Sequence, residues 1–227
     1  MTSYVKRSLI EANSKRREYS LYGRIMVLVK DPLPEDIHLA DALRSIEKRV
    51  PERMFHNVDI VYIGEFPELE ERDVASAYLD GAIYTTNTHH TSGDFIKNII
   101  HEMAHSIEQY SKAELYYDGK IENEFLGKRK RLASQLSQND LAVGFDISKL
   151  MNPEYDKEVD EFLWFSVGYP TLLTLTMGLF ATPYSAACLR EYFAEGVEQY
   201  FIGAKEDVAQ ISPALYNKIK QIDEFLI

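Results

Sequence analysis

The chain is poor in the residues that mark several common classes of protein. Its 227 residues include one cysteine, Cys188, and one tryptophan. A single cysteine excludes an intrachain disulfide, which agrees with a reducing compartment. Basic residues are also few, because 25 Lys and Arg stand against 36 Asp and Glu and the formal net charge is −11. Nucleic acids and anionic membranes require basic surfaces, so we expect neither as a partner.

Long apolar runs are scarce as well. Residues 1–20 lack the apolar core of a signal peptide, so we expect a cytoplasmic protein or one exported by a route that the sequence does not reveal. Residues 4–20 are instead expected to form a helix. Residues 162–189 carry no charge and are long enough to cross a bilayer, but they contain two glycines and two prolines. We interpret this stretch as a buried helix followed by a loop.

One run of four basic residues, Lys128 to Arg131, departs from the acidic character of the chain. Runs of this kind are usually one solvated face of a helix. We therefore predict that these side chains are exposed and bind no partner.

The apolar residues make up 45% of the chain and suffice for a sizeable core. The first half predicts strands over 24–29, 58–63, 74–79 and 82–86, helices over 35–50 and 94–110, and an acidic connector over 66–73. Asp80-Gly81 between two β-prone runs predicts a hairpin. The second half predicts helices over 122–138, 153–163, 171–179, 189–201 and 213–226. These elements predict an α+β fold in one domain, with an α/β lobe over 1–110 and an all-helical lobe over 111–227.

The helix predicted over 94–110 contains His101-Glu102-Met103-Ala104-His105, the H-E-x-x-H pattern. Residues four apart lie on one face of a helix, so both imidazoles can reach one metal ion. Glu102 can then act as general base on a metal-activated water. Apolar residues at helical spacing predict a buried stripe beside the histidines, and Ser92-Gly93-Asp94 predicts the helix start. We expect one Zn²⁺ per chain.

A catalytic zinc site needs a third protein ligand. The sequence Arg190-Glu191-Tyr192-Phe193-Ala194-Glu195 offers two glutamates four apart on one helix face. One of them can bind the metal, while the other accepts the free N–H of a ligand histidine.

These two motifs together resemble the gluzincin zinc peptidases, in particular the catalytic domain of anthrax lethal factor and the Pro-Pro endopeptidases. The resemblance covers roughly residues 74–201 and implies a zincin-like fold, a small mixed sheet with an active-site helix and a helical lobe. It implies Glu191 as the third ligand and Glu195 as the partner of a histidine ligand. Tyr184 stands seven residues before Glu191, where the family has a tyrosine that donates a hydrogen bond to the developing oxyanion.

The resemblance also implies a protein or peptide substrate that pairs with an edge strand of the sheet. The outer strand of the predicted hairpin supplies Ser76, Ala77 and Tyr78 for this pairing. Residues 111–160 are longer than the family needs and predict an additional helical element. The sequence carries no signal for an oligomeric state.

Two other classes of function stay open. The chain could be a non-catalytic zincin-fold structural or interaction protein, or a latent peptidase whose insert covers the cleft. A domain that uses zinc for stability alone does not need Glu102, which favours the peptidase. His89 and His90 precede the motif helix, and we expect this pair to be solvated. Cys188 is expected to be a small buried residue.

Overall fold

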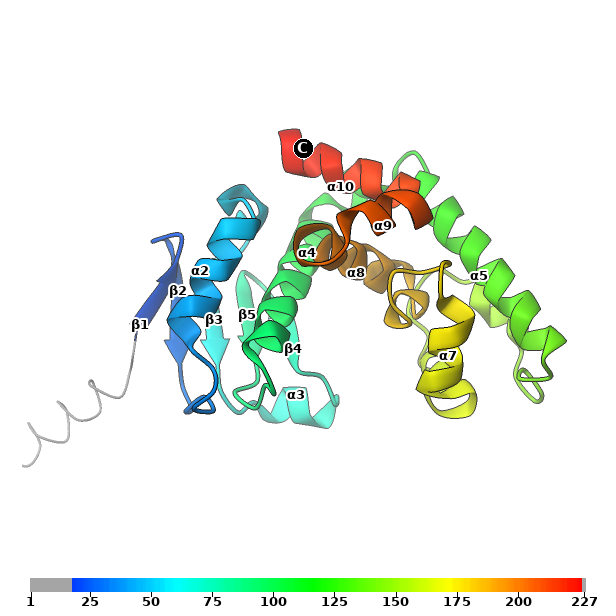
Figure 1. Ribbon diagram of the computed structural model, residues 1–227, viewed down its shortest axis with the longest axis horizontal. Helices are drawn as coiled ribbons and strands as arrows, with labels where there is room; N and C mark the ends of the chain where they lie inside the picture. The colour runs from blue at the N-terminus through cyan, green and yellow to red at the C-terminus, as the bar shows by residue number, and fades with distance from the viewer. Residues whose placement is uncertain (1–17, 226–227) are drawn as a thin grey trace, which may run out of the picture. The chain divides into compact units, whose positions relative to one another are not determined.

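The computed structural model describes residues 18–225 and divides into two compact units, Met1–Ser106 and Ile107–Ile227 (Figure 1). The first contains a mixed β-sheet with helices, and the second is helical throughout the residues that the structure describes. This confirms the α+β class predicted from the sequence.

The sheet of the first unit has five strands: β1 (Glu18–Leu21), β2 (Ile25–Val29), β3 (Ile60–Ile63), β4 (Ser76–Leu79) and β5 (Ala82–Thr85). Their order is β1-β2-β3-β5-β4. β2, β3 and β5 run parallel, and β1 and β4 pair antiparallel at the two edges. The helix predicted over 4–20 lies mostly outside the described residues. It was wrong for its last residues, which form β1 because they pair with the apolar strand β2.

One face of the sheet is buried and the other is partly open. Val27, Val61 and Ile83 on the buried face are 0% exposed, whereas Met26 is 47% exposed. Helix α2 (Leu39–Arg49) crosses in front of β2 and β3 in Figure 1, and its buried residues are Leu39, Ala42, Leu43 and Ile46. Each of the leucine and isoleucine side chains contributes about 1.5–3 kcal/mol on full burial.

The hairpin β4–β5 turns at the predicted Asp80-Gly81. Both residues have positive φ, 46° and 86°, as a two-residue hairpin turn requires. The connector before it contains a short helix, α3 (Pro67–Glu71), with proline in its first turn and Leu69 buried. This helix was not predicted, because the acidic segment was interpreted as a connector.

Helix α4 (Ser92–Tyr116) carries the H-E-x-x-H pattern. Its cap is Thr91, which accepts a hydrogen bond from Asp94 N at 3.1 Å and donates one to Asp94 Oδ2 at 2.9 Å. The helix cap thus lies one residue before the predicted Ser92, because the Thr91 hydroxyl accepts from the N–H of the third residue of the helix. The helix extends beyond the predicted Tyr110, past a non-helical residue at Ser111.

The second unit contains six α-helices among its described residues. They are α5 (Lys120–Gln138), α6 (Lys157–Glu161), α7 (Tyr169–Thr176), α8 (Leu189–Ile202), α9 (Lys205–Ile211) and α10 (Pro213–Phe225). Shorter helical turns are η2 (Ile147–Met151), the π-helical η3 (Phe162–Gly168) and η4 (Tyr184–Ala186). α9 was not predicted. Within residues 18–225 no helix has the length and apolar character needed to cross a membrane.

Helix α5 anchors α8 and α10. The carboxylate of Glu124 accepts hydrogen bonds from Ala214 N at 2.8 Å and Leu215 N at 3.1 Å, which satisfies the first turn of α10. The same carboxylate accepts one from the Tyr192 hydroxyl at 2.8 Å. A Cβ at Gly196 would lie 2.3 Å from Leu215 Cδ2, so glycine is required where α8 meets α10.

The prediction that Lys128 and Arg129 are exposed was wrong. Lys128 is 6% exposed, and its Nζ donates at 2.7 Å to Leu179 O, Ile211 O and Ser212 Oγ. Arg129 is 0% exposed and donates to four main-chain carbonyls, those of Leu150, Asn152, Ala186 and Ala187. Both cations are buried because carbonyl groups from distant loops converge on them.

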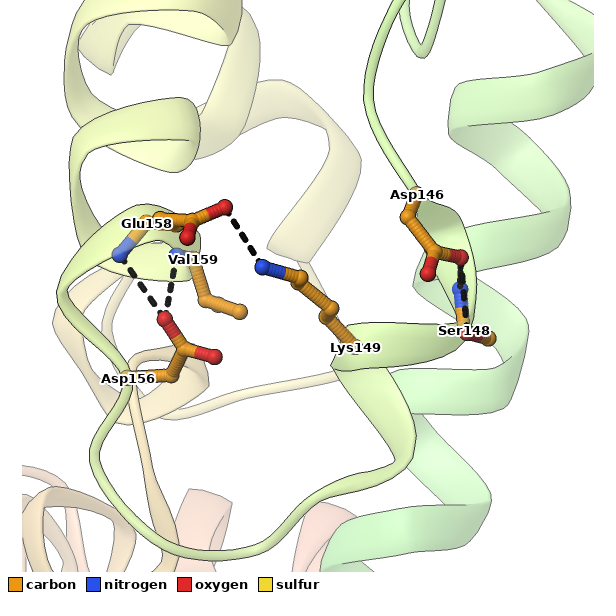
Figure 2. A network of polar contacts seen from close by, with 6 residues as sticks. All are labelled: Asp146, Ser148, Lys149, Asp156, Glu158 and Val159. Carbon is orange, nitrogen blue, oxygen red and sulfur yellow. Dashed lines mark hydrogen bonds and ion pairs between the residues drawn. The ribbon is translucent and has the colours of Figure 1, made fainter.

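The segment between α5 and α7 is held by local polar contacts (Figure 2). Asp146 caps η2 by accepting from Ser148 N at 3.0 Å, and Asp156 caps α6 by accepting from Glu158 N at 2.8 Å. Lys149 Nζ bridges the two turns, 2.5 Å from Glu158 Oε2. The additional element predicted over 111–160 is therefore helical, ordered by its own caps and by the Arg129 contacts to Leu150 and Asn152.

Candidate metal centre

His101 and His105 lie together on one face of α4 in the first unit. Their ring centroids are 4.6 Å apart with the planes at 85°, and a ring nitrogen of each lies within 4.8 Å of the other. Two nitrogens bound to one zinc ion at about 2.0–2.1 Å can be at most about 4.2 Å apart. A small rotation of the imidazoles meets this limit, so the pair could hold a divalent metal.

The opposite side of α4 fixes the direction of these imidazoles. Ile99, Ile100 and Met103 are 0% exposed and anchor the helix in the core. His105 is 5% exposed and His101 is half-buried at the edge of this core. The buried stripe predicted from helical spacing is thereby confirmed for these positions.

Glu102 points towards the edge strand. It is 4% exposed, and its Oε1 accepts a hydrogen bond from Ser76 Oγ at 2.8 Å. Ser76 is the first residue of β4. Sequence reasoning selected Ser76 for main-chain pairing and missed this side-chain contact, because the two residues are 26 positions apart and belong to different elements.

β4 is an edge strand of the sheet. Ala75 O accepts from Thr86 N at 2.8 Å, so pairs in this ladder alternate and the main chain of Ser76 is directed away from β5. Ser76 and Ala77 are partly exposed. Tyr78 is 7% exposed, and its hydroxyl donates to Asn57 O at 2.8 Å, so its side chain belongs to the core.

Three carboxylates share one face of α8 in the second unit. Glu191, Glu195 and Glu198 follow an i, i+4, i+7 spacing, and carboxylate oxygens of Glu195 and Glu198 lie within 4.8 Å of one another. Glu195 Oε2 accepts a hydrogen bond from Thr182 Oγ1 at 2.6 Å. Sequence reasoning missed the buried Glu198, although its helical spacing from Glu191 was a usable signal.

Tyr184 lies in η4, just before α8. Burial raises the pKa of its phenol, and the negative charge of Glu191 raises that pKa further. The Tyr184 ring lies 6.0 Å from that of Trp164. The phenol therefore stays protonated at neutral pH and can donate a hydrogen bond.

The expectation that His89 is solvated was wrong. His89 is 6% exposed, and its Nε2 lies 2.9 Å from Thr85 Oγ1. Burial lowers the pKa of His89 despite the neighbouring charge of Asp94. His90 is exposed, as expected. Cys188 is buried, as expected, and immediately precedes α8.

The predicted residues thus form two sets. The first unit brings together His101, Glu102, His105 and Ser76, and the second holds Tyr184, Glu191 and Glu195 near one another. Comparisons with protein-family models, curated proteins and solved structures found no match to this chain. The resemblance to gluzincins therefore rests on the motif residues themselves.

Proposed function

We propose that the chain is a zincin-like, zinc-dependent metalloendopeptidase that hydrolyses peptide bonds. The observation that carries the proposal is the H-E-x-x-H face of α4. It combines two imidazole nitrogens within 4.8 Å with a carboxylate held beside them by Ser76. A helix that used zinc for stability alone would have no need to hold Glu102 in place.

Glu191 is the proposed third ligand. Two imidazoles and one carboxylate make a donor set that is typical of catalytic zinc. The pair of Glu108 and Arg190 supports this choice, because Arg190 Nε lies 3.6 Å from Glu108 Oε2. Glu108 is three residues after His105 on α4, and Arg190 immediately precedes Glu191.

Zinc held by these residues would polarise the attacking water and the scissile carbonyl. Glu102 takes the proton of that water and delivers it to the leaving amine. Its hydrogen bond from Ser76 keeps one carboxylate oxygen fixed, which directs the other towards the water. The protonated phenol of Tyr184 donates to the oxygen on which negative charge develops. Glu195 accepts the N–H of a ligand histidine and fixes its orientation.

The substrate is a protein or peptide in extended conformation. It pairs with the outward main chain of Ser76 and Tyr78, on either side of Ala77 and next to the Ser76 hydroxyl that holds Glu102. Main-chain pairing of this kind would set the scissile bond beside the proposed base.

The test is incubation of the purified, zinc-loaded protein with a proteome-derived peptide library, with new termini read by mass spectrometry. Glu102→Gln is the matched control, since it keeps the shape of the side chain and removes its basicity. New termini made by the wild type and absent with the control are the expected result. Equal cleavage by both proteins, or none by either, would contradict the proposal and favour the non-catalytic zincin-fold role.

A further inference from the structure

A cavity of about 400 Å³ opens in the first unit between α3, the start of β4 and the start of α4. Its size lies within the range of pockets that bind small groups. The catalytic roles proposed above do not use it.

The lining of this cavity combines an apolar wall with carboxylates. Phe66, Leu69 and Val74 supply the apolar part, and the acidic groups are Glu70, Asp73 and Asp94. Among residues 18–225, no lysine or arginine lines the cavity. His89 and His90 also line it, and burial lowers the pKa of the His89 imidazole, so His89 adds no positive charge at neutral pH. A long aliphatic chain that ends in a cation fits such a lining, because its methylenes cover apolar surface and its charge meets the carboxylates.

The cavity lies beside the proposed catalytic residues. Asp94 and Asn98 line it, and they share one face of α4 with His101 and His105 at i, i+4, i+7 and i+11. Asn98 is three residues, about 4.5 Å, before His101 along the helix axis.

The cavity also lies next to the edge strand β4. Val74 and Ala75 line the cavity and immediately precede Ser76, whose hydroxyl holds Glu102. Residues of a strand advance about 3.3 Å each, so a peptide paired at Ser76 passes the cavity within one to three residues.

From this geometry we propose that the cavity is the subsite for a lysine or arginine side chain of the substrate, within about three residues of the scissile bond. The inference rests on the proposed peptidase function and deepens it by naming the substrate class. Glu70 and Asp73 determine the specificity, since Asp94 also serves the cap of α4 through Thr91.

Two peptides that differ in charge alone test the inference. Within the sequence that the library yields, each position near the scissile bond is replaced by arginine and by citrulline, its neutral isostere. The wild type should cleave the arginine peptide roughly tenfold faster at one position. Glu70 and Asp73 are exposed, so each charge pair contributes modestly and both carboxylates are replaced together. The double variant Glu70→Gln, Asp73→Asn should lose most of this preference. Asparagine tolerates the positive φ of 52° at position 73.

Glu71→Gln is the matched control, because Glu71 is an exposed carboxylate of α3 that does not line the cavity. It should keep the full preference for arginine. Equal cleavage of the arginine and citrulline peptides by the wild type would overturn the inference, while the peptidase function would stand. A preference for leucine at that position would have the same two consequences.

A binding measurement separates the two proposals. Fluorescence anisotropy records the binding of a labelled alanine heptapeptide with a central arginine to the Glu102→Gln protein. If the wild type cleaves no peptide but the double substitution still weakens the binding of the arginine heptapeptide, the peptidase function is contradicted and the cationic subsite is supported. Equal binding of the citrulline heptapeptide would overturn the subsite whatever the activity.

Discussion

The hydroxyl of Ser76, at the start of the edge strand β4, donates a 2.8 Å hydrogen bond to Glu102 on helix α4. This contact links the strand proposed to bind the peptide with the proposed general base. The position of the carboxylate that is expected to move the proton therefore depends on β4.

Replacing Ser76 by alanine should slow catalysis without unfolding the protein. A hydrogen bond to a charged group contributes about 1.5–3 kcal/mol, so we expect kcat/KM to fall roughly 10- to 100-fold. Ser76→Thr retains the hydroxyl and should recover most of the rate. Steady-state kinetics on one cleaved peptide provide the measurement, and circular dichroism checks the fold. An alanine variant with the wild-type rate would show that the contact has no catalytic role.

Replacing Arg129 by methionine should destabilise the second unit strongly. Four carbonyl oxygens would lose their donor in a site that is 0% exposed, so the free energy of unfolding should fall by about 3–5 kcal/mol. Urea denaturation followed by circular dichroism measures the change. Lys130→Met, at the exposed neighbouring position, should shift stability by less than about 0.5 kcal/mol. Similar losses in both variants would contradict the structural role of Arg129.

Lys128 should make the protein more stable as the pH rises from 7.5 to 9.5. Burial lowers the pKa of Lys128 to about 8, below its usual value of 10.5 in the unfolded chain. Between these two values the unfolded state binds the extra proton, so stability rises with pH, by roughly 2 kcal/mol over this interval. The comparison is the free energy of unfolding of the wild type and of Lys128→Met at both pH values. A pH dependence identical in the two proteins would show that the carbonyl hydrogen bonds keep Lys128 protonated.

Cys188 should be inert towards thiol reagents in the folded protein. It is 1% exposed, and burial raises the pKa of its thiol to about 12, so almost no thiolate is present at neutral pH. Ellman's reagent should titrate one thiol per chain in guanidinium and react slowly without it. Reaction of the native protein at the rate of a free thiol would place Cys188 in an accessible position.

Local patterns in the sequence predicted most of the framework. Asp80-Gly81 located the hairpin because a two-residue turn demands positive φ, and helical spacing located the buried face of α4. The roles proposed for His101, Glu102 and His105 likewise rest on their spacing along one helix. Each of these features depends on residues within one or two turns of each other.

Features that depend on distant residues were not predictable in this way. Lys128 and Arg129 are buried because acceptors 21 to 84 positions away surround them. His89 is buried through Thr85 and the core beneath α4, although its loop sequence is polar. The contact from Ser76 to Glu102 likewise depends on how β4 packs against α4.

Zinc binding by a matched set of variants tests the central claim most directly. Inductively coupled plasma mass spectrometry gives the zinc content of each protein after metal removal and dialysis against a zinc buffer. The wild type and Glu102→Gln should hold one zinc ion, and His105→Ala and Glu191→Ala should hold little. Glu195→Ala should keep zinc with roughly 10- to 100-fold weaker affinity. Wild-type affinity in Glu191→Ala would show that another residue completes the site, and a wild type that takes up no zinc would contradict the account as a whole.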